Sequence, residues 1–399
     1  MMSDAPDILG ADPRPAFFPV ENAAEIGLEP PDDRLGLPVR TWVRALAGMQ
    51  KEAIVVNGAT GRCWRLVSDE GPYLSGHDQA PCPLCIFITG MVSSYMNELI
   101  AAADRGGLAL ADVELTLGNH YSMEGSALKG TMLGGAQTPE LAATIVADAD
   151  ISDLEELVRQ AVTVSPINGL LEDVNNSLFN LSWNGQQVTV GEVESLDTEM
   201  LPDPGPQFDR VRVADFEIAD DLMIKVKPAE AIEGVPGGAQ SSLQDSQSRT
   251  LHVQAKCRQR DDGIKVIRES LFRPIGSEFR FLSEEAPGFG AAARAPDAVT
   301  YLAAGIGFCF MTQFGRYASI TRKQLDGYRI VQDTHFSPGG EAGSGKAHPV
   351  ETHVYLDTPE GEDFARKILD MGERTCFLHA TCRTALDVNA TVDRVDSLD

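Results

Sequence analysis

The segment RTCFLHATCR, residues 374–383, holds two cysteines and a histidine in a chain that has only seven cysteines and seven histidines. His379 follows Cys376 by three residues, about one helical turn, and Arg374 and Arg383 flank the segment. A nearby cation or imidazole stabilises a thiolate, the form of cysteine that attacks peroxides, disulfides and carbonyl carbons. The alternative is that this segment is a turn in the protein core, and that its charged residues only cap the turn. The segment therefore predicts a candidate reactive thiol at Cys376, with His379 beside it.

A second candidate, Cys309, lies inside a very apolar segment, residues 295–318. Packing as a small hydrophobe is the simplest role for such a cysteine, because free cysteine is among the most buried residue types. If Cys309 and Cys376 meet in space, however, a redox mechanism follows. The Cys309 thiolate would attack a peroxide oxygen and become a sulfenic acid, and the Cys376 thiol would condense with it to a disulfide. An external dithiol would then reduce that disulfide by exchange.

Two other classes of function use the same residues. Cys309 or Cys376 could attack a carbonyl group, with His379 as general base, in a hydrolase for an activated ester, a thioester or a C–C bond next to a ketone. In a non-enzymatic protein, a redox sensor or a small-molecule binding protein, the cysteines would only pack or bind. Trapping a new disulfide or an acyl-cysteine distinguishes these functions.

The first part of the chain carries a C-P-L-C motif, Cys82 and Cys85, with His77 five residues before it. A CxxC motif can be redox-active or can form half of a zinc site. His120 and Cys63 could complete a zinc site, but the sequence has no second CxxC to support it. Buried packing is therefore the first interpretation of this motif, and we predict no metal and no cofactor.

The elements around these residues fall into two blocks, 39–200 and 209–399, after an N-terminal arm at 1–38. The Pro- and Gly-containing segment 202–208 is a predicted linker, and 234–248 a predicted flexible loop. In the first block the patterns predict strands at 52–56, 63–69 and 108–117, a buried helix from 83 to Gly106–Gly107, and helices at 138–149 and 151–162. In the second block they predict strands at 248–257, 263–272, 277–285, 325–336 and 348–358, a buried helix at 295–318 and a C-terminal helical region.

The two blocks repeat one another in their order of elements. Thr-Pro-Glu, a good helix start, opens the predicted helices at 138–140 and 358–360. Ser94 and Cys309 occupy matching places in the two apolar helices. Ser165 follows Ser94 by 71 residues, and Cys376 follows Cys309 by 67. The second block therefore has two cysteines where the first has two serines.

The segments PYLSGHDQAPCPLCIFITGMVSS (72–94) and PGFGAAARAPDAVTYLAAGIGFC (287–309), together with Cys376, carry a family resemblance. The chain resembles a tandem of two domains of the OsmC/Ohr family of thiol-dependent peroxide reductases. The resemblance implies an α+β fold in which antiparallel sheet wraps a central buried helix. It also implies intertwined domains that form an intramolecular pseudo-dimer, a cysteine pair at Cys309 and Cys376, and an organic hydroperoxide as substrate.

The sequence departs from the family in both blocks. Ser94 and Ser165 replace the two cysteines in the first block, so only the second block is expected to be active. A family glutamate near the helix start is replaced by Leu84 and Cys85 in one block and by Val299 and Thr300 in the other. The resemblance places the activating arginine on an early strand, with Arg62 and Arg260 as candidates. The predicted catalytic set is Cys309, Cys376, His379 and Arg62.

Composition limits the partners. A net charge of −26 disfavours binding to nucleic acid and to anionic membranes, which would both repel the chain. The N-terminus lacks the basic and apolar regions of a secretory signal, and no apolar run approaches the roughly 18 residues of a membrane span. These features predict a cytoplasmic protein. The family resemblance implies a small apolar substrate and a dithiol reductant, and it leaves a further homodimer open.

Overall fold

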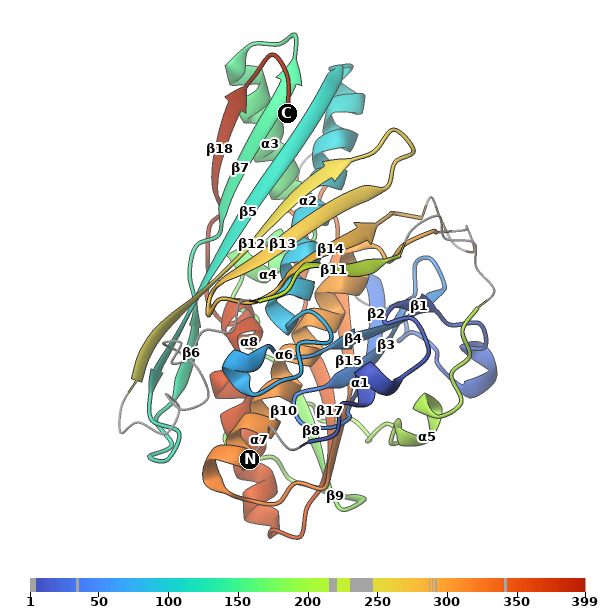
Figure 1. Cartoon of the computed structure of the whole chain (residues 1–399), viewed down its shortest axis with the longest axis vertical. Coiled ribbons are helices and arrows are strands. Elements are labelled where there is room, and N and C mark those ends of the chain that lie inside the picture. The colour runs from blue at the N-terminus through green and yellow to red at the C-terminus, as the bar shows by residue number, and fades with distance from the viewer. Residues whose placement is uncertain are drawn as a thin grey trace.

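The computed structural model describes residues 5–33, 36–214, 221–229, 247–286, 288, 290, 293–340 and 343–398, and shows a mixed α+β fold with two sheets (Figure 1). The first sheet has the order β1 (Phe18–Pro19), β4 (Arg62–Ser68), β3 (Lys51–Asn57), β2 (Leu37–Ala45), β15 (Gly327–Ser337), β17 (Glu351–Asp357), β8 (Leu178–Trp183) and β10 (Glu194–Ser195). The short strands β16 (Lys346–Ala347) and β9 (Gln186–Val188) pair with β15 and β8.

The second sheet has the order β11 (Met223–Lys227), β14 (Glu278–Ser283), β13 (Lys265–Arg273), β12 (Gln247–Gln259), β5 (Leu110–Gly125), β7 (Glu140–Ala147) and β18 (Asn389–Arg394). The strand β6 (Leu133–Ala136) pairs with β5. The two sheets have the same strand order. Three antiparallel strands, β2–β3–β4 in the first sheet and β12–β13–β14 in the second, are followed by two strands from the other block, β15–β17 and β5–β7 respectively. One parallel strand comes next, β8 in the first sheet and β18 in the second. Each sheet therefore contains strands from both sequence blocks.

Two long helices, α2 (Pro83–Gly106) and α6 (Ala298–Thr321), cross between the sheets and form the centre of the core. Both are long and apolar enough to span a membrane, but most of their residues are buried inside this fold. A Cβ atom added at Gly90 would lie 2.8 Å from Leu302, and one added at Gly305 would lie 2.7 Å from Phe87. The absence of side chains at these glycines therefore lets the two backbones approach closely. The two helices are antiparallel where they cross, because the earlier residue of α2, Phe87, faces the later residue of α6, Gly305.

The local sequence explains where these helices begin and end. Cys82 is the N-cap of α2 and Pro83 its first residue, a position that needs no N–H. Gly107 ends α2 in the left-handed conformation, with φ 67°. Asp297 caps α6 by accepting a hydrogen bond from the Thr300 N–H. These ends agree with the predicted apolar helices to within a few residues.

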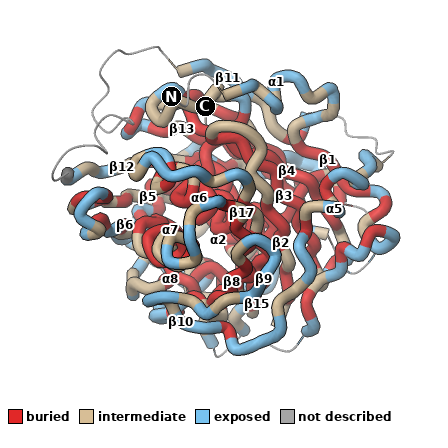
Figure 2. Tube along the Cα trace, turned by 90° about the horizontal axis from the view of Figure 1, so that it is seen from below, coloured by how far each residue is buried: buried red, intermediate tan, exposed pale blue. Residues whose placement is uncertain are grey.

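Shorter helices surround the core, and Figure 2 shows the buried interior that they and the sheets enclose. They are α1 (Ile8–Ala11), α3 (Ile151–Val164), α4 (Asn168–Glu172), α5 (Gly205–Phe208), α7 (Glu362–Thr375) and α8 (Phe377–Cys382), with 3-10 turns at Ala24–Ile26 and Pro72–Leu74. The break between α7 and α8 falls at Cys376, which caps both helices. This break holds Cys376 at the start of α8.

One predicted helix is wrong. Residues 138–149 contain the strand β7 instead, and Thr-Pro-Glu at 138–140 leads into that strand. Leu141, Ala143 and Ile145 are buried while their neighbours are more exposed, which is the alternation of a half-buried strand. The helix-start signal was therefore overridden by a period of two and by β-branched residues.

The N-terminal arm and the segment between the two blocks both contain regular structure. The N-terminal arm adds β1 to the first sheet and buries Phe17 and Phe18. The predicted linker at 202–208 contains the whole of α5. Of the predicted loop at 234–248, residues 234–246 lie outside the described residues.

Candidate functional site

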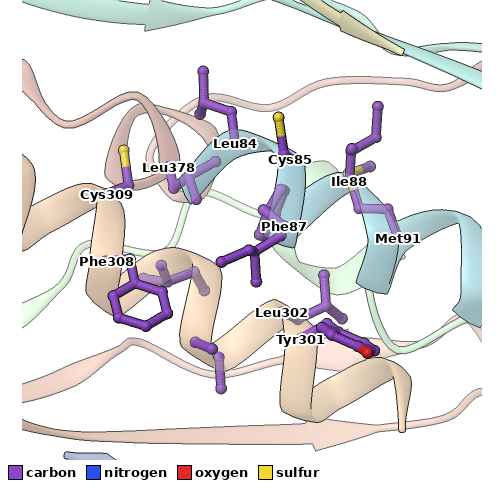
Figure 3. Close-up of a cluster of buried hydrophobic side chains, with 14 of the residues drawn as sticks. Leu84, Cys85, Phe87, Ile88, Met91, Tyr301, Leu302, Phe308, Cys309 and Leu378 are labelled. Atoms are coloured by element: carbon purple, nitrogen blue, oxygen red, sulfur yellow. The ribbon is translucent and has the colours of Figure 1, made fainter. Parts of the chain in front are cut away.

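The crossing of α2 and α6 creates a small cavity beside Cys309. Cys309 lies one turn after Gly305, and Pro83 lies one turn before Phe87, so the antiparallel crossing brings Cys309 to the start of α2. Figure 3 shows the sulfur atoms of Cys309 and Cys85 on the same side of this crossing. The cavity encloses about 40 Å³. Its lining includes Glu70, Tyr73, Cys82, Leu84, Arg249, Leu251, Leu271, Pro274, Cys309, Gln313, Arg316 and Phe377.

The structure places the Cys376 thiol beside that of Cys309. Cys376 is fully buried at the N-cap of α8, where its Sγ accepts a hydrogen bond from the His379 N–H at 3.5 Å. Burial and the neighbouring Cys376 thiol raise the pKa of Cys309, while the N–H groups of Phe377 and Leu378 oppose this rise. The pair therefore adjoins a cavity, and the first N–H groups of α8 face the Cys309 sulfur.

Two arginines and a carboxylate line the cavity, and the sequence interpretation missed all three. Arg316 follows Cys309 by two helical turns and is 5% exposed. Burial lowers its pKa, and the negative charges of Glu70 and of a Cys309 thiolate oppose that change. Arg249 reaches the same cavity from β12, and burial beside Arg316 lowers its pKa to about 9. Glu70 accepts a hydrogen bond from the Tyr73 hydroxyl at 2.8 Å.

One signal in the sequence could have identified Arg316. It is the only charged residue in α6, and it follows Cys309 by seven residues, which places both on one face of the helix. No comparable signal marks Glu70 or Arg249, because both reach the cavity only through tertiary structure.

The arginines chosen from the sequence lie elsewhere. Arg62 is on β4 and is not among the cavity-lining residues. Arg260, in the turn between β12 and β13, donates to Asp262 at 3.0 Å. The cations at the Cys309 cavity are thus Arg316 and Arg249.

His379 is fully buried and follows Cys376 by three residues, but it does not line the cavity. The centroid of its ring lies 4.6 Å from that of Phe310 and 5.7 Å from that of Phe179. Among the described residues, neither ring nitrogen has a hydrogen-bond partner. Burial, with a smaller effect of Arg383, lowers the pKa of His379 to about 3. The imidazole is therefore neutral at pH 7, and it is not among the groups that line the cavity.

The first block has a matching polar pair. The hydroxyl groups of Ser94 and Ser165 lie 2.7 Å apart, and both residues are buried. Ser94 is on α2 and Ser165 is the C-cap of α3, as Cys309 is on α6 and Cys376 the C-cap of α7. The serine pair is thus the geometric counterpart of the cysteine pair.

The CxxC motif lies at the start of α2. The Cys82 and Cys85 sulfurs are 3.1 Å apart, and both residues are buried. His77 instead bonds the Ala5 carbonyl oxygen at 2.9 Å. Across the described residues, no group of three or more histidine, cysteine or acidic side chains is placed to hold a metal ion.

The described residues form an α+β fold. Its buried cysteine pair consists of Cys309 on the core helix α6 and Cys376 at the start of α8. Residues 290–391, which include both cysteines of the pair, match the family model of OsmC-like proteins. No curated protein matches the chain. Among solved structures, the chain is similar to the crystal structure of an OsmC-like hydroperoxide resistance protein from Jannaschia sp. CCS1. That likeness has 17% identity and a TM-score of 0.22, and it covers 31% of this chain and 81% of the other.

Proposed function

We propose that this protein reduces organic hydroperoxides through Cys309 and Cys376. The observation that carries the proposal is the contact between these two thiols at a cavity lined by Arg316. The OsmC-like match over 290–391 supports peroxide-related thiol chemistry for the same region. The hydrolase alternative needs a general base at the thiol, and His379 lies outside the cavity.

The proposed reaction moves two electrons from the thiols to the peroxide. The Cys309 thiolate attacks the distal peroxide oxygen, the O–O bond breaks, and Cys309 becomes a sulfenic acid as an alcohol leaves. The Cys376 thiol then attacks the Cys309 sulfur, and water leaves as the disulfide forms. Arg316 supplies positive charge that stabilises both the thiolate and the departing alkoxide. A dithiol restores the two thiols by exchange.

The lining favours a small apolar substrate. Leu84, Leu251, Leu271 and Pro274 supply apolar contacts. A volume of about 40 Å³ accepts little more than the hydroperoxide group itself. The organic part of the substrate would therefore contact the mouth of the cavity.

Mass spectrometry of the full chain tests the proposal. We expect one equivalent of cumene hydroperoxide to produce a Cys309–Cys376 disulfide as the peroxide is consumed. The C376S variant should instead accumulate a sulfenic acid at Cys309 that dimedone traps. C382S, which removes a buried thiol that does not line the cavity, is the matched control. Unmodified Cys309 with full peroxide recovery would overturn the proposal, and an acyl-cysteine after treatment with an activated ester would favour the hydrolase.

We also propose that the chain is a tandem duplication that forms an intramolecular pseudo-dimer. The common strand order of the two sheets supports this, as does a match between CWRLVSDEGP (63–72) and EFRFLSEEAP (278–287). The register is also shared, because Lys51 pairs with Ser68 on one sheet and Lys265 pairs with Ser283 on the other.

We also propose a cytoplasmic location, which the seven free cysteines support, because thiols stay reduced in that compartment.

A further inference from the structure

The C-P-L-C motif forms a second dithiol that the proposed peroxide chemistry does not use. Cys82 is the N-cap of α2 and Cys85 lies in its first turn. Burial raises the pKa of the Cys85 thiol, so its ionisation needs a proton acceptor. The 3.1 Å between their sulfurs means that a small movement suffices to form a disulfide.

The two thiols have different neighbours. Cys82 lines the cavity that also contains Cys309, and with 7% exposure it is the most accessible of the four cysteines in this region. Cys85 is not among the cavity-lining residues, and its thiol interacts with the side chain of Glu269 on β13. Cys82 is thus placed to exchange with Cys309, while Cys85 is placed to give up its proton to Glu269.

Glu269 has the properties of a proton acceptor. It is fully buried, and among the described residues neither of its carboxylate oxygens accepts a hydrogen bond of normal geometry. Burial raises the pKa of Glu269 to about 8, against the opposing effect of the Cys85 thiol. A buried carboxyl group with a pKa near neutrality, beside a thiol, is a typical functional arrangement.

We propose that the Cys82–Cys85 dithiol is an internal electron donor that reduces the Cys309–Cys376 disulfide, with Glu269 as the proton acceptor for Cys85. This inference rests on the proposed peroxide reduction. It gives the buried disulfide a route to reductant, because Cys376 is fully buried and Cys309 is only 2% exposed. An external dithiol would then need to reach only Cys82.

The exchange balances in two steps. The Cys82 thiol attacks the Cys309 sulfur, the Cys309–Cys376 bond breaks, and the Cys82 proton passes to the departing Cys376 sulfur. Glu269 takes the proton from Cys85, whose thiolate attacks the Cys82 sulfur and releases Cys309 as a thiolate. A Cys82–Cys85 disulfide remains, and an external dithiol reduces it to complete the cycle.

Disulfide mapping over time, with rapid acid quenching and alkylation, tests the exchange. In the reduced full chain, one equivalent of cumene hydroperoxide should give a Cys309–Cys376 disulfide that is replaced by a Cys82–Cys85 disulfide. C85S should trap a mixed disulfide between Cys82 and Cys309, and C82S should retain the Cys309–Cys376 disulfide. C257S, which changes another buried thiol outside the cavity, should behave like the wild type.

The two proposals fail in different ways. A wild-type Cys309–Cys376 disulfide that persists as long as in C82S/C85S, with Cys82 and Cys85 still reduced, would overturn the internal donor alone. Absence of Cys309 oxidation in every variant would overturn the peroxide proposal. In that case the C85S variant still tests the exchange, because it cannot form the Cys82–Cys85 disulfide: one equivalent of diamide should give the Cys309–Cys376 disulfide first and the Cys82–Cys309 mixed disulfide afterwards.

The role of Glu269 has its own readout. E269Q should slow formation of the Cys82–Cys85 disulfide by roughly 100-fold, the usual size of a general-base effect, and leave the rate of Cys309 oxidation unchanged. E155Q, at an exposed position on α3, is the matched control. Equal exchange rates in E269Q and wild type would exclude Glu269 as the proton acceptor.

Discussion

Arg316 is the cation that shares both a helix and a cavity with Cys309. It acts beside the N–H groups of Phe377 and Leu378, which also favour the Cys309 thiolate. Burial and the adjacent Cys376 thiol disfavour the Cys309 thiolate, and Arg316 supplies an opposing positive charge. Both residues line one cavity on one helix face. The thiol is therefore held mostly protonated at neutral pH, and its rate of attack must follow the small thiolate fraction.

We predict a rate of Cys309 oxidation that rises about tenfold for each pH unit between pH 6 and 9, because the raised pKa of Cys309 lies above this range. R316Q should lower the rate by roughly tenfold or more at every pH, and R316K should recover part of it. Stopped-flow oxidation with cumene hydroperoxide measures both effects. R322Q, at the exposed end of the same helix, should match the wild type. A plateau near pH 6, or an unchanged rate in R316Q, would contradict this role.

The serine pair allows a second prediction at the residue scale. S94C/S165C should form a disulfide on treatment with diamide, because the two hydroxyl oxygens are already 2.7 Å apart. Its reaction with cumene hydroperoxide should be at least about tenfold slower than that of the Cys309 pair, since Ala101 stands seven residues after Ser94 where Arg316 follows Cys309. Mass spectrometry of the two disulfides in one sample provides an internal comparison. Equal peroxide rates would show that the arginine is dispensable.

At the scale of elements, the crossing of α2 and α6 sets the geometry of the cavity. Gly305 is tested by G305A, whose added Cβ would lie 2.7 Å from Phe87. We expect a loss of about 1 to 3 kcal/mol in the free energy of unfolding, together with slower Cys309 oxidation as the start of α2 shifts. Denaturant unfolding measures the first effect.

The same helix pair supplies the control for that experiment. At Gly106, the last residue of α2, an added Cβ would meet no atom within 4 Å. G106A should therefore leave the free energy of unfolding unchanged or raise it by up to about 1 kcal/mol, because alanine favours a helix more than glycine does. Similar losses in both variants would show that the crossing does not require Gly305.

Local patterns predicted most of the elements but not their partners. The two apolar helices and the strands before them follow from hydrophobic period and from caps such as Gly107. The helix predicted for residues 138–149 is wrong because a local Thr-Pro-Glu signal competes there with a weak alternation of small residues. The cysteine pair could be predicted from the matched serines, whereas Arg249, Glu70 and Glu269 could not. Their proximity to the cysteines depends on which strands pair, and no local signal encodes that.

At the scale of the whole molecule, neither block can complete its sheet alone. The strands β2 and β15 pair across the two blocks, and so do β5 and β12. The ion pair between Arg40 and Asp333, at 2.7 Å, joins residues 293 positions apart. The Cys309 cavity likewise takes Glu70 and Cys82 from the first block. The proposed activity therefore belongs to the intact chain and not to the block that carries the cysteine pair.

The pairing of β2 with β15 also has a consequence for synthesis. The partner of Val39 is Thr334, so the ribosome must add 295 more residues (334 − 39) before β15 can pair with β2. At about 5 to 20 residues per second, this takes roughly 15 to 60 s. During that time β2 has an open edge and apolar residues without their final packing. The nascent chain is thus a candidate substrate for chaperones that shield strand edges until translation nears its end.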